Sequence, residues 1–201
     1  SVIRTETVFY SLTKIYDKLL IIKKDVGVMQ VFGDSLLEIS DGNRVSNEKI
    51  NFYCILPYEN NKMLFVARNG CFLYDGKLIK RFNTEADDFI INNRIYCGIM
   101  NSSGDYVLGT LNGGIIVMDK SGKVRKIINK ETGLRDNKVH FLYQDKQNCI
   151  WAGLDNGFSY IALNTSFSIY TEERCGFSGF INSMLRYKKM LYISTAIGLH
   201  K

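Results

Sequence analysis

The residue types that usually carry chemistry are sparse in this chain, and their spacing matches no catalytic or metal site. The histidines His140 and His200 are far apart in the sequence, and neither belongs to a zinc-binding motif. Residues 176–179 lack the pattern of a nucleophile elbow, and residues 109–114 lack the spacing of a dinucleotide-binding loop. We therefore expect no catalytic residue, no bound metal and no cofactor, and we expect the chain not to be an enzyme.

Two aspartates are the remaining candidates for catalysis. Asp25 and Asp155 each stand two residues before a glycine that recurs along the chain, so a closed ring of repeats could place them face to face. Paired carboxylates can act as general acid and base on a glycosidic bond. An Asp in such a turn usually bonds the backbone of the turn itself, and we favour that interpretation.

The composition indicates a folded chain that is rich in β-structure. The chain is 46% hydrophobic, and its 12 Tyr and 12 Phe favour strands. The net charge is +6, but the basic residues are scattered among acidic ones, so nucleic-acid binding is not expected. The cysteines lack a Cys-x-x-Cys pair, and we expect buried free thiols, with one disulfide as the alternative: Cys54, Cys71, Cys97, Cys149 and Cys175.

No apolar stretch reaches the roughly 18 residues of a membrane span, and the N-terminus has neither an initiator Met nor a signal-peptide profile. We therefore expect a soluble fragment of a longer protein.

A repeat of about 43 residues organises the whole chain. Five copies align on one glycine each, with separations of 43, 43, 44 and 41 residues: Gly27, Gly70, Gly113, Gly157 and Gly198. Two consecutive apolar residues stand six and seven positions before each glycine: Leu20-Ile21, Met63-Leu64, Tyr106-Val107, Ile150-Trp151 and Leu191-Tyr192. Only the segment after the glycine varies in length, so each copy behaves as one structural unit.

The fourth copy predicts four short strands, at residues 139–144, 149–154, 158–163 and 167–170. A tight turn over residues 155–157 joins the second strand to the third, and its Asn-Gly pair is typical of two-residue hairpins that need positive φ. We expect Gly157 to occupy such a turn, and Gly122 to lie in a looser connection. Paired apolar residues in the second strand indicate that both faces of the sheet are buried.

These observations predict an all-β fold, a β-propeller of about five four-stranded antiparallel blades. Residues 1–201 form one domain or a propeller fragment, with repeats near residues 8–45, 50–90, 93–131, 137–172 and 178–201. Residues 1–7 could supply a closing strand. A closed five-bladed ring and part of a larger, seven-bladed propeller are both compatible with the repeat, and a solenoid of stacked sheets is the alternative architecture.

The fourth copy resembles the two-component-regulator propeller repeat. That repeat reads Gly-Leu, Asn-x-Val, Asp, apolar-Trp and Asn-Gly-Leu, and the copy contains Gly133-Leu134, Asn137-Lys138-Val139, Asp145, Ile150-Trp151 and Asn156-Gly157-Phe158. The first two copies match weakly, since they lack the Trp and Lys23 and Lys24 replace small residues. Such repeats form the periplasmic region of hybrid two-component sensor histidine kinases from glycan-degrading gut bacteria. The resemblance implies signal transduction by sensing of an oligosaccharide in the periplasm, in a receptor that reaches the membrane through the rest of the chain.

In a propeller, the first strand of each blade lines the axis, and the turns between second and third strands share a face with the loops between blades. We therefore predict ligand-binding residues on that face: Asp25, Arg68, Asn69, Asn112, Asp155 and Asn156 from the turns, and Arg94, Arg135 and Asp136 from the loops. Taken singly, each of these is better explained as a solvated turn residue.

Aromatic residues recur seventeen positions before the glycine: Tyr10, Tyr53, Tyr96 and His140, with Ile181 in the fifth copy. They could stack on sugar rings, but we interpret them, like Trp151, as core. Cys54 and Cys97 are expected to be small apolar fillers of that core.

Three functions remain open: a sensory binding module, which we favour, a protein-interaction scaffold that could form a homodimer through the parent receptor, and a five-bladed-propeller glycoside hydrolase.

Overall fold

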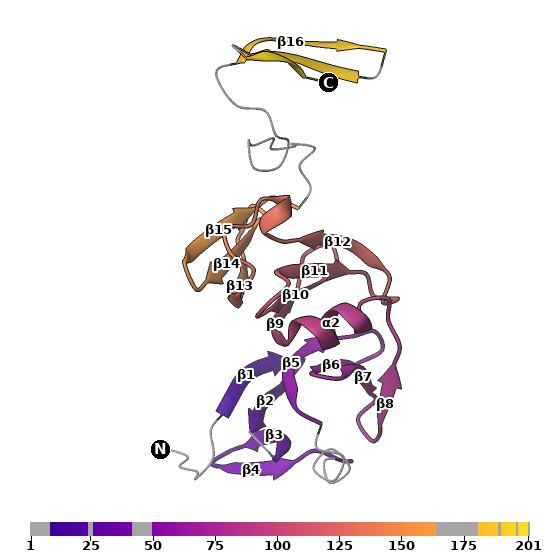
Figure 1. Cartoon of the computed structure of the whole chain (residues 1–201). Coiled ribbons are helices and arrows are strands. Elements are labelled where there is room, and N and C mark those ends of the chain that lie inside the picture. The colour runs from indigo at the N-terminus through magenta and orange to yellow at the C-terminus, as the bar shows by residue number, and fades with distance from the viewer. Residues whose placement is uncertain are drawn as a thin grey trace. The chain divides into compact units, whose positions relative to one another are not determined.

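The structure is a computed structural model, and it describes residues 9–23, 26–41, 50–163, 181–188, 190–195 and 197–200. Within these residues the chain forms five antiparallel sheets of consecutive strands (Figure 1). The chain divides into two compact units, Ser1–Leu163 with the first four sheets and Asn164–Lys201 with the fifth. The predicted blades are therefore confirmed, while the predicted closing strand at residues 1–7 lies outside the described residues.

The strands keep the order of the sequence in every sheet. The first three sheets have four described strands each: β1 (Phe9–Ile15), β2 (Lys18–Lys23), β3 (Gly27–Phe32) and β4 (Ser35–Glu38); β5 (Phe52–Pro57), β6 (Met63–Ala67), β7 (Gly70–Tyr74) and β8 (Ile79–Phe82); β9 (Ile95–Met100), β10 (Tyr106–Thr110), β11 (Ile115–Met118) and β12 (Val124–Ile128). The last two have three each: β13 (Val139–Gln144), β14 (Ile150–Leu154) and β15 (Gly157–Ile161); β16 (Ile181–Tyr187), β17 (Met190–Thr195) and β18 (Gly198–His200). The fourth strand predicted at residues 167–170 lies outside the described residues.

The recurring glycine opens the third strand of four sheets, as the repeat predicts. Strands β3, β7, β15 and β18 all begin at it. In the third sheet the turn is longer, because β11 begins at Ile115 and the positive φ of 83° belongs to Gly114 instead of Gly113. Thr110 closes this longer turn, since its side-chain oxygen accepts a hydrogen bond from the Gly113 N–H at 3.0 Å. The first two strands of this copy keep the register that the alignment on Gly113 predicts, and the shift of one residue begins in the turn.

The hairpin glycines, and not the asparagines before them, take the left-handed conformation. Gly70 and Gly157 have φ of 118° and 91°, whereas Asn69 and Asn156 are not among the described residues with positive φ. The two-residue loops thus differ from the turn with two positive φ angles that the Asn-Gly pair predicted. The prediction for Gly122 is also wrong: its φ is 87°, and a Cβ there would meet the Thr84 Cγ2 at 2.7 Å.

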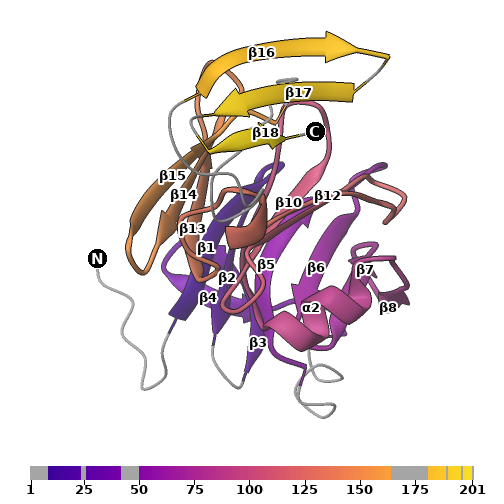
Figure 2. The same cartoon turned by 45° about the horizontal axis from the view of Figure 1, so that its top comes forward.

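A short helix, α2 (Asp87–Asn93), lies in the connection between the second and third sheets and packs against β7 (Figure 2). The sequence prediction of a nearly all-β chain missed it, because seven residues are too few for a helical period to show. The negative charges of Asp87 and Asp88 in its first turn stabilise the helix through its dipole, and Ile90 is fully buried. A single turn of 3-10 helix, η1 (Lys130–Thr132), lies before the fourth sheet and is closed by a capping box from Asn129.

Within the first unit, the cores lie between successive sheets. In β6, Met63, Phe65 and Ala67 pack toward the first sheet, while Leu64 and Val66 pack toward the third. All five side chains are buried, which confirms for the second blade that the paired apolar residues of its second strand occupy two buried faces. Among the described residues, no helix combines the length and the apolar composition that crossing a membrane would require.

Candidate functional site

The first strands of the first four sheets line one groove. Strands β1, β5, β9 and β13 contribute side chains to a cavity of about 640 Å³ within the first unit. This confirms, for the first four blades, the prediction that the first strand of each blade faces a common interior. The groove is a concave surface to which four blades contribute residues, as small-molecule sites commonly require.

A β-bulge recurs near the start of each of these strands. The strand pairing skips one residue in every case, as where Phe52 faces Ala67 but Cys54 faces Val66. The skipped residues in the four sheets are Tyr10, Tyr53, Tyr96 and His140, the aromatic positions of the repeat. A bulge residue is left out of the ladder and its side chain is re-aimed, which explains how four equivalent side chains reach the groove.

These four residues form an aromatic rim, and the interpretation as core is wrong for Tyr10 and Tyr96, whereas Tyr53 is partly buried against the core between the second and third sheets. Tyr10 and Tyr96 are 46% and 43% exposed. The rings of Tyr10 and Tyr53 stack with centroids 6.0 Å apart, and Tyr96 meets His140 edge-on at 5.4 Å. Ile181, the fifth member of the predicted set, lies on β16 in the other unit and is exposed.

The next residue along two of the strands packs into the core. Cys54 is buried between the second and third sheets, and burial raises the pKa of its thiol. Burial likewise raises the pKa of the Cys97 thiol to about 12. Both thiols are therefore protonated and unreactive at neutral pH, in line with the prediction that they fill the core.

A charged cluster borders the rim at the fourth sheet. Asp155, in the turn between β14 and β15, lies with its Oδ1 2.6 Å from the His140 Nε2, and its Oδ2 accepts a hydrogen bond from the Lys138 Nζ. The hydrogen bond from Lys138, followed by that from His140, lowers the pKa of the Asp155 carboxyl. Such a carboxylate stays ionised at neutral pH and is poorly suited to act as a general acid. Asp25, its predicted partner, lies outside the described residues.

The turn residues Arg68 and Asn69 border a second, shallower hollow of about 360 Å³, together with Asn51 and Ile91. The Asn69 carbonyl accepts a hydrogen bond from Arg81. The guanidinium of Arg81 is itself held by Asp87 at 2.7 Å. The backbone of Asn69 at the edge of this hollow is therefore held in place. The hollow is formed by one turn and its neighbours, and not by several blades.

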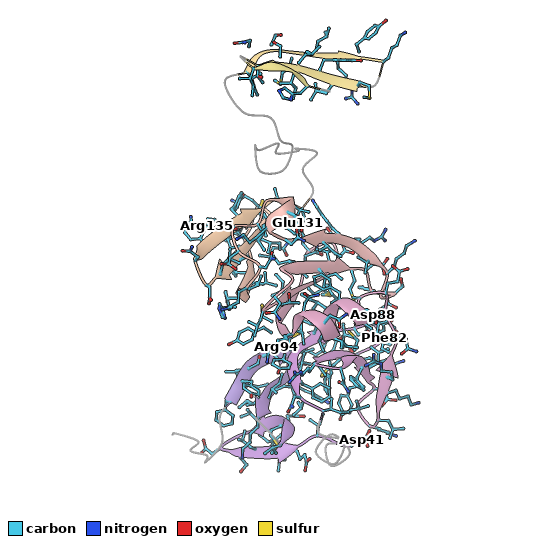
Figure 3. All side chains as sticks on the ribbon, viewed as in Figure 1. Asp41, Phe82, Asp88, Arg94, Glu131 and Arg135 are labelled. Atoms are coloured by element: carbon cyan, nitrogen blue, oxygen red, sulfur yellow. The ribbon has the colours of Figure 1, made fainter. Side chains whose placement is uncertain are left out.

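The remaining predicted residues lie in two separate places, and Figure 3 labels one residue of each, Arg94 and Arg135. Arg94 ends α2 with a φ of 58°, and its carbonyl accepts the Leu111 N–H at 3.0 Å, next to Asn112 in the same turn. Arg135 lies near the β14–β15 turn, since its N–H donates to the Ser159 Oγ at 3.3 Å. Asp136 accepts the Lys138 N–H at 3.0 Å, and Asn156 is in the turn itself. The structure thus joins loops to neighbouring turns as predicted, and the ligand-binding role of these residues stays a prediction.

Trp151 closes the turn between β13 and β14 instead of filling the core. Its Nε1–H donates to the Asp145 Oδ2 at 2.8 Å, while the Asp145 Oδ1 accepts the N–H groups of Gln147 and Cys149. Its side chain is 38% exposed, so the interpretation of Trp151 as core is wrong. No group of three or more His, Cys, Asp or Glu side chains arranged to hold a metal ion occurs within the described residues.

No protein-family model matches the chain, and no curated protein matches its sequence. Solved structures do match. The extracellular domain of a hybrid two-component system from B. thetaiotaomicron has a TM-score of 0.59 at 14% identity, over 89% of this chain and 25% of that chain. The extracellular domain of a one-component system from the same organism has a TM-score of 0.58 at 16% identity, over 96% of this chain and 29% of that chain.

A third structural match comes from a different kind of protein. The WD40 β-propeller domain of Doa1 has a TM-score of 0.57 at 13% identity, over 79% of this chain and 51% of that chain. The fold is a set of β-propeller blades. The chain spans less than a third of the length of the two extracellular domains that it matches.

Proposed function

We propose that the chain is an extracytoplasmic ligand-sensing propeller module of a two-component receptor, and that its ligand is a saccharide bound in the groove. One observation carries the proposal. Four bulge residues, at one repeated position of four blades, all turn into a single groove. Bulges are over-represented where a strand re-aims a side chain for binding, and several blades acting on one ligand can couple its presence to the arrangement of the blades.

The chemistry of the rim suits a saccharide. Tyr10 and Tyr96 each expose close to half of a side chain that joins an apolar ring face to a polar hydroxyl. Sugar rings present apolar C–H faces and polar edges, so such residues match them on both counts. Ser11 and Thr13 add hydroxyl groups to the lining.

The extracellular two-component and one-component domains with the same fold support placing the module outside the cytoplasm, where it would act as part of a receptor. In this account the chain itself performs no catalysis. A kinase, a membrane anchor and pairing into a homodimer would all belong to the parent protein.

A second candidate, a protein-interaction scaffold, is favoured by one feature of the fourth sheet. Trp151, Phe158 and Tyr160 form an aromatic cluster, with ring centroids 5.5 and 5.0 Å from Trp151, and all three are exposed within the described structure. Scaffolds commonly bind through such surfaces.

The two candidates separate in one experiment. A saccharide library should be screened by thermal shift on the whole chain, and the oligomeric state should be measured in parallel. We expect at least one saccharide to raise the melting temperature without changing the mass of the particle. Stabilisation that appears only with self-association, and with no saccharide, would favour the scaffold. The neighbouring sequence of the gene tests the receptor assignment, since a membrane span followed by kinase motifs is expected.

A further inference from the structure

Two charged neighbours fix the rim residue of the fourth blade. The Oδ1 of Asp155 lies 2.6 Å from the Nε2 of His140, and the Oδ2 of the same carboxylate accepts a hydrogen bond from the Lys138 Nζ. These bonds, chiefly the one from Lys138, lower the pKa of the Asp155 carboxyl, so it is ionised near neutral pH and can only accept hydrogen bonds. The imidazole must therefore donate through Nε2, which sets the edge of the ring that faces the turn.

The members of this cluster differ in their access to the groove. His140 lines the groove, whereas Lys138 and Asp155 are not among its lining residues. The ring of His140 also meets the ring of Tyr96 from the neighbouring blade edge-on, with centroids 5.4 Å apart. The contacts thus run from Lys138 through Asp155 to His140 and on to Tyr96, and they end at two side chains that a ligand in the groove can touch. Asp155 can therefore influence a ligand without contacting it.

The cluster contributes little to the stability of the fold. The side chains of Lys138, Asp155 and His140 are 44%, 46% and 40% exposed. Ion pairs with this much access to water are worth little in the free energy of unfolding. The charges of Lys138 and Asp155 oppose each other across one hydrogen bond, so the pair satisfies itself. What the cluster does supply is a fixed orientation for the ring at its groove end.

The repeat combines this carboxylate with the histidine in the fourth copy. Asp155 stands two residues before the recurring glycine, where the second and third copies have Arg68 and Leu111, each with a tyrosine at the rim. A rim tyrosine can be held by ring stacking, as Tyr53 is by Tyr10 with centroids 6.0 Å apart. An imidazole has a smaller face, and the rotation of such a ring about χ2 has two broad minima. A hydrogen bond from the ring to a fixed carboxylate selects one of them.

We propose that Asp155 is a positioning residue of the groove: with Lys138 it holds the His140 ring in the orientation that the saccharide contacts, and it touches no part of the saccharide itself. This inference rests on the proposed function, because it concerns the same groove and the same ligand. Ordering a mobile side chain during binding costs affinity, and a ring that is held beforehand avoids this cost. The role of Asp155 thus differs from the direct ligand contact that the sequence predicts.

A double-mutant cycle on the whole chain tests this proposal. The variants are D155A, H140A and the double variant, and the probes for calorimetric titration are cellotetraose, xylotetraose and a β-1,4-linked galactotetraose. These saccharides carry no charge, so loss of a carboxylate does not change their long-range attraction to the protein. We expect the wild type to bind at least one of them, H140A to bind it about tenfold more weakly and D155A about fivefold more weakly. In the H140A background, D155A should cause no further loss.

Two further variants assign the effect to the cluster. K138M leaves the bond between Asp155 and His140 in place but removes the support behind it, so it should weaken binding less than D155A does. D17A removes an exposed carboxylate from the turn between β1 and β2 and should bind like the wild type. All these variants should melt near the wild-type temperature, because the side chains that they change are well exposed.

The outcomes separate the inference from the proposed function. Losses that add up in the double variant, or a larger loss in K138M than in D155A, would show that the charged residues contact the saccharide directly and would overturn the inference. Wild-type binding by D155A or H140A, or a D155A variant that melts well below the wild type, would also overturn it. Each of these results leaves the proposed function standing, because the wild-type chain still binds the saccharide. If none of the three tetrasaccharides binds the wild type, both the inference and the proposed function fail.

Discussion

Strand β6 and the rim of the groove both belong to the repeat, but the side chains of β6 are buried and the rim residues face the groove. All five side chains of β6 are buried, and they pack alternately toward the two neighbouring sheets. The rim residues Tyr96 and His140 sit at a bulge, outside the regular ladder, and remain accessible from the groove. The comparison indicates that regular pairing builds the blade, while one irregular residue per blade provides the surface for a ligand. Changes in β6 should therefore alter stability, and changes at the rim should alter binding.

The largest expected effect is a loss of stability when a core residue of β6 is truncated. Phe65 is fully buried and its ring packs against Phe52 at 5.0 Å and Tyr74 at 5.3 Å. Phe65→Ala should lower the free energy of unfolding by about 3–5 kcal/mol, because it removes these contacts and leaves a cavity. Urea denaturation measures this directly.

Phe158→Ala is the matched control, since the same ring on β15 is 64% exposed. Its loss should stay within about 0.5 kcal/mol. A comparable loss in both variants would show that the exposed face of the fourth sheet is covered in solution, and the contrast between core and surface would need revision.

A smaller loss of stability is expected when either of two turn glycines is replaced by Val. The structure predicts the larger loss at Gly122, whereas the sequence had predicted it at Gly157. Gly122 and Gly157 both have positive φ, so Val at either position should cost about 1–3 kcal/mol in backbone strain. At Gly122 a Cβ would also meet Thr84 at 2.7 Å, whereas at Gly157 the nearest side-chain atoms, those of Arg135, are 3.9 Å away. Gly122→Val should therefore have the lower denaturation midpoint. Equal midpoints, or the opposite order, would contradict this account.

A pH-dependent effect is expected at the turn that Asp145 closes. The hydrogen bond from Trp151, and then that from the Cys149 N–H, lower the pKa of the Asp145 carboxyl in the folded state. A lowered folded-state pKa means that the ionised carboxylate stabilises the fold above its unfolded pKa of about 3.9, and that this contribution is lost as pH falls through the folded value.

Asp145→Asn should consequently lower the melting temperature near neutral pH, and the difference from the wild type should shrink as the pH is lowered from about 5 toward 3. Asp17→Asn, in the exposed turn between β1 and β2, is the control and should leave the melting temperature near that of the wild type at neutral pH. A constant difference for Asp145→Asn across this range would rule out the carboxylate as its cause.

The sequence allowed the blades to be predicted because their core is periodic. The constant spacing between the apolar pair and the glycine reflects one hairpin geometry, and β6 and β10 bury both faces as expected. The first strands also line a common groove, as the fold requires. These features follow from regular pairing, which leaves a clear pattern along the chain.

The features that escaped prediction are the ones that break this pattern. The aromatic residues before the glycine were interpreted as core, because simple alternation cannot reveal a bulge that turns one residue aside. Helix α2 depends on burying Ile90 against neighbouring elements more than on any helical period of its own. The six-residue spacing between Asp145 and Trp151 could have indicated their hydrogen bond. Trp151 was assigned to the core instead, because it belongs to the apolar pair of the repeat.

The central claim is that bulge residues of several blades form the ligand surface, and a matched pair of tyrosines tests it most directly. Tyr96→Ala removes a ring from the rim that is 43% exposed, and Tyr143→Ala removes a ring from β13 that is 55% exposed and does not line the groove. Affinity for the saccharide that gives the largest thermal shift should be measured by calorimetry on the whole chain. We predict that Tyr96→Ala weakens binding about tenfold with an unchanged melting temperature, and that Tyr143→Ala leaves binding intact. Equal losses in the two variants, or a loss only in Tyr143→Ala, would contradict the assignment of the groove as the ligand site.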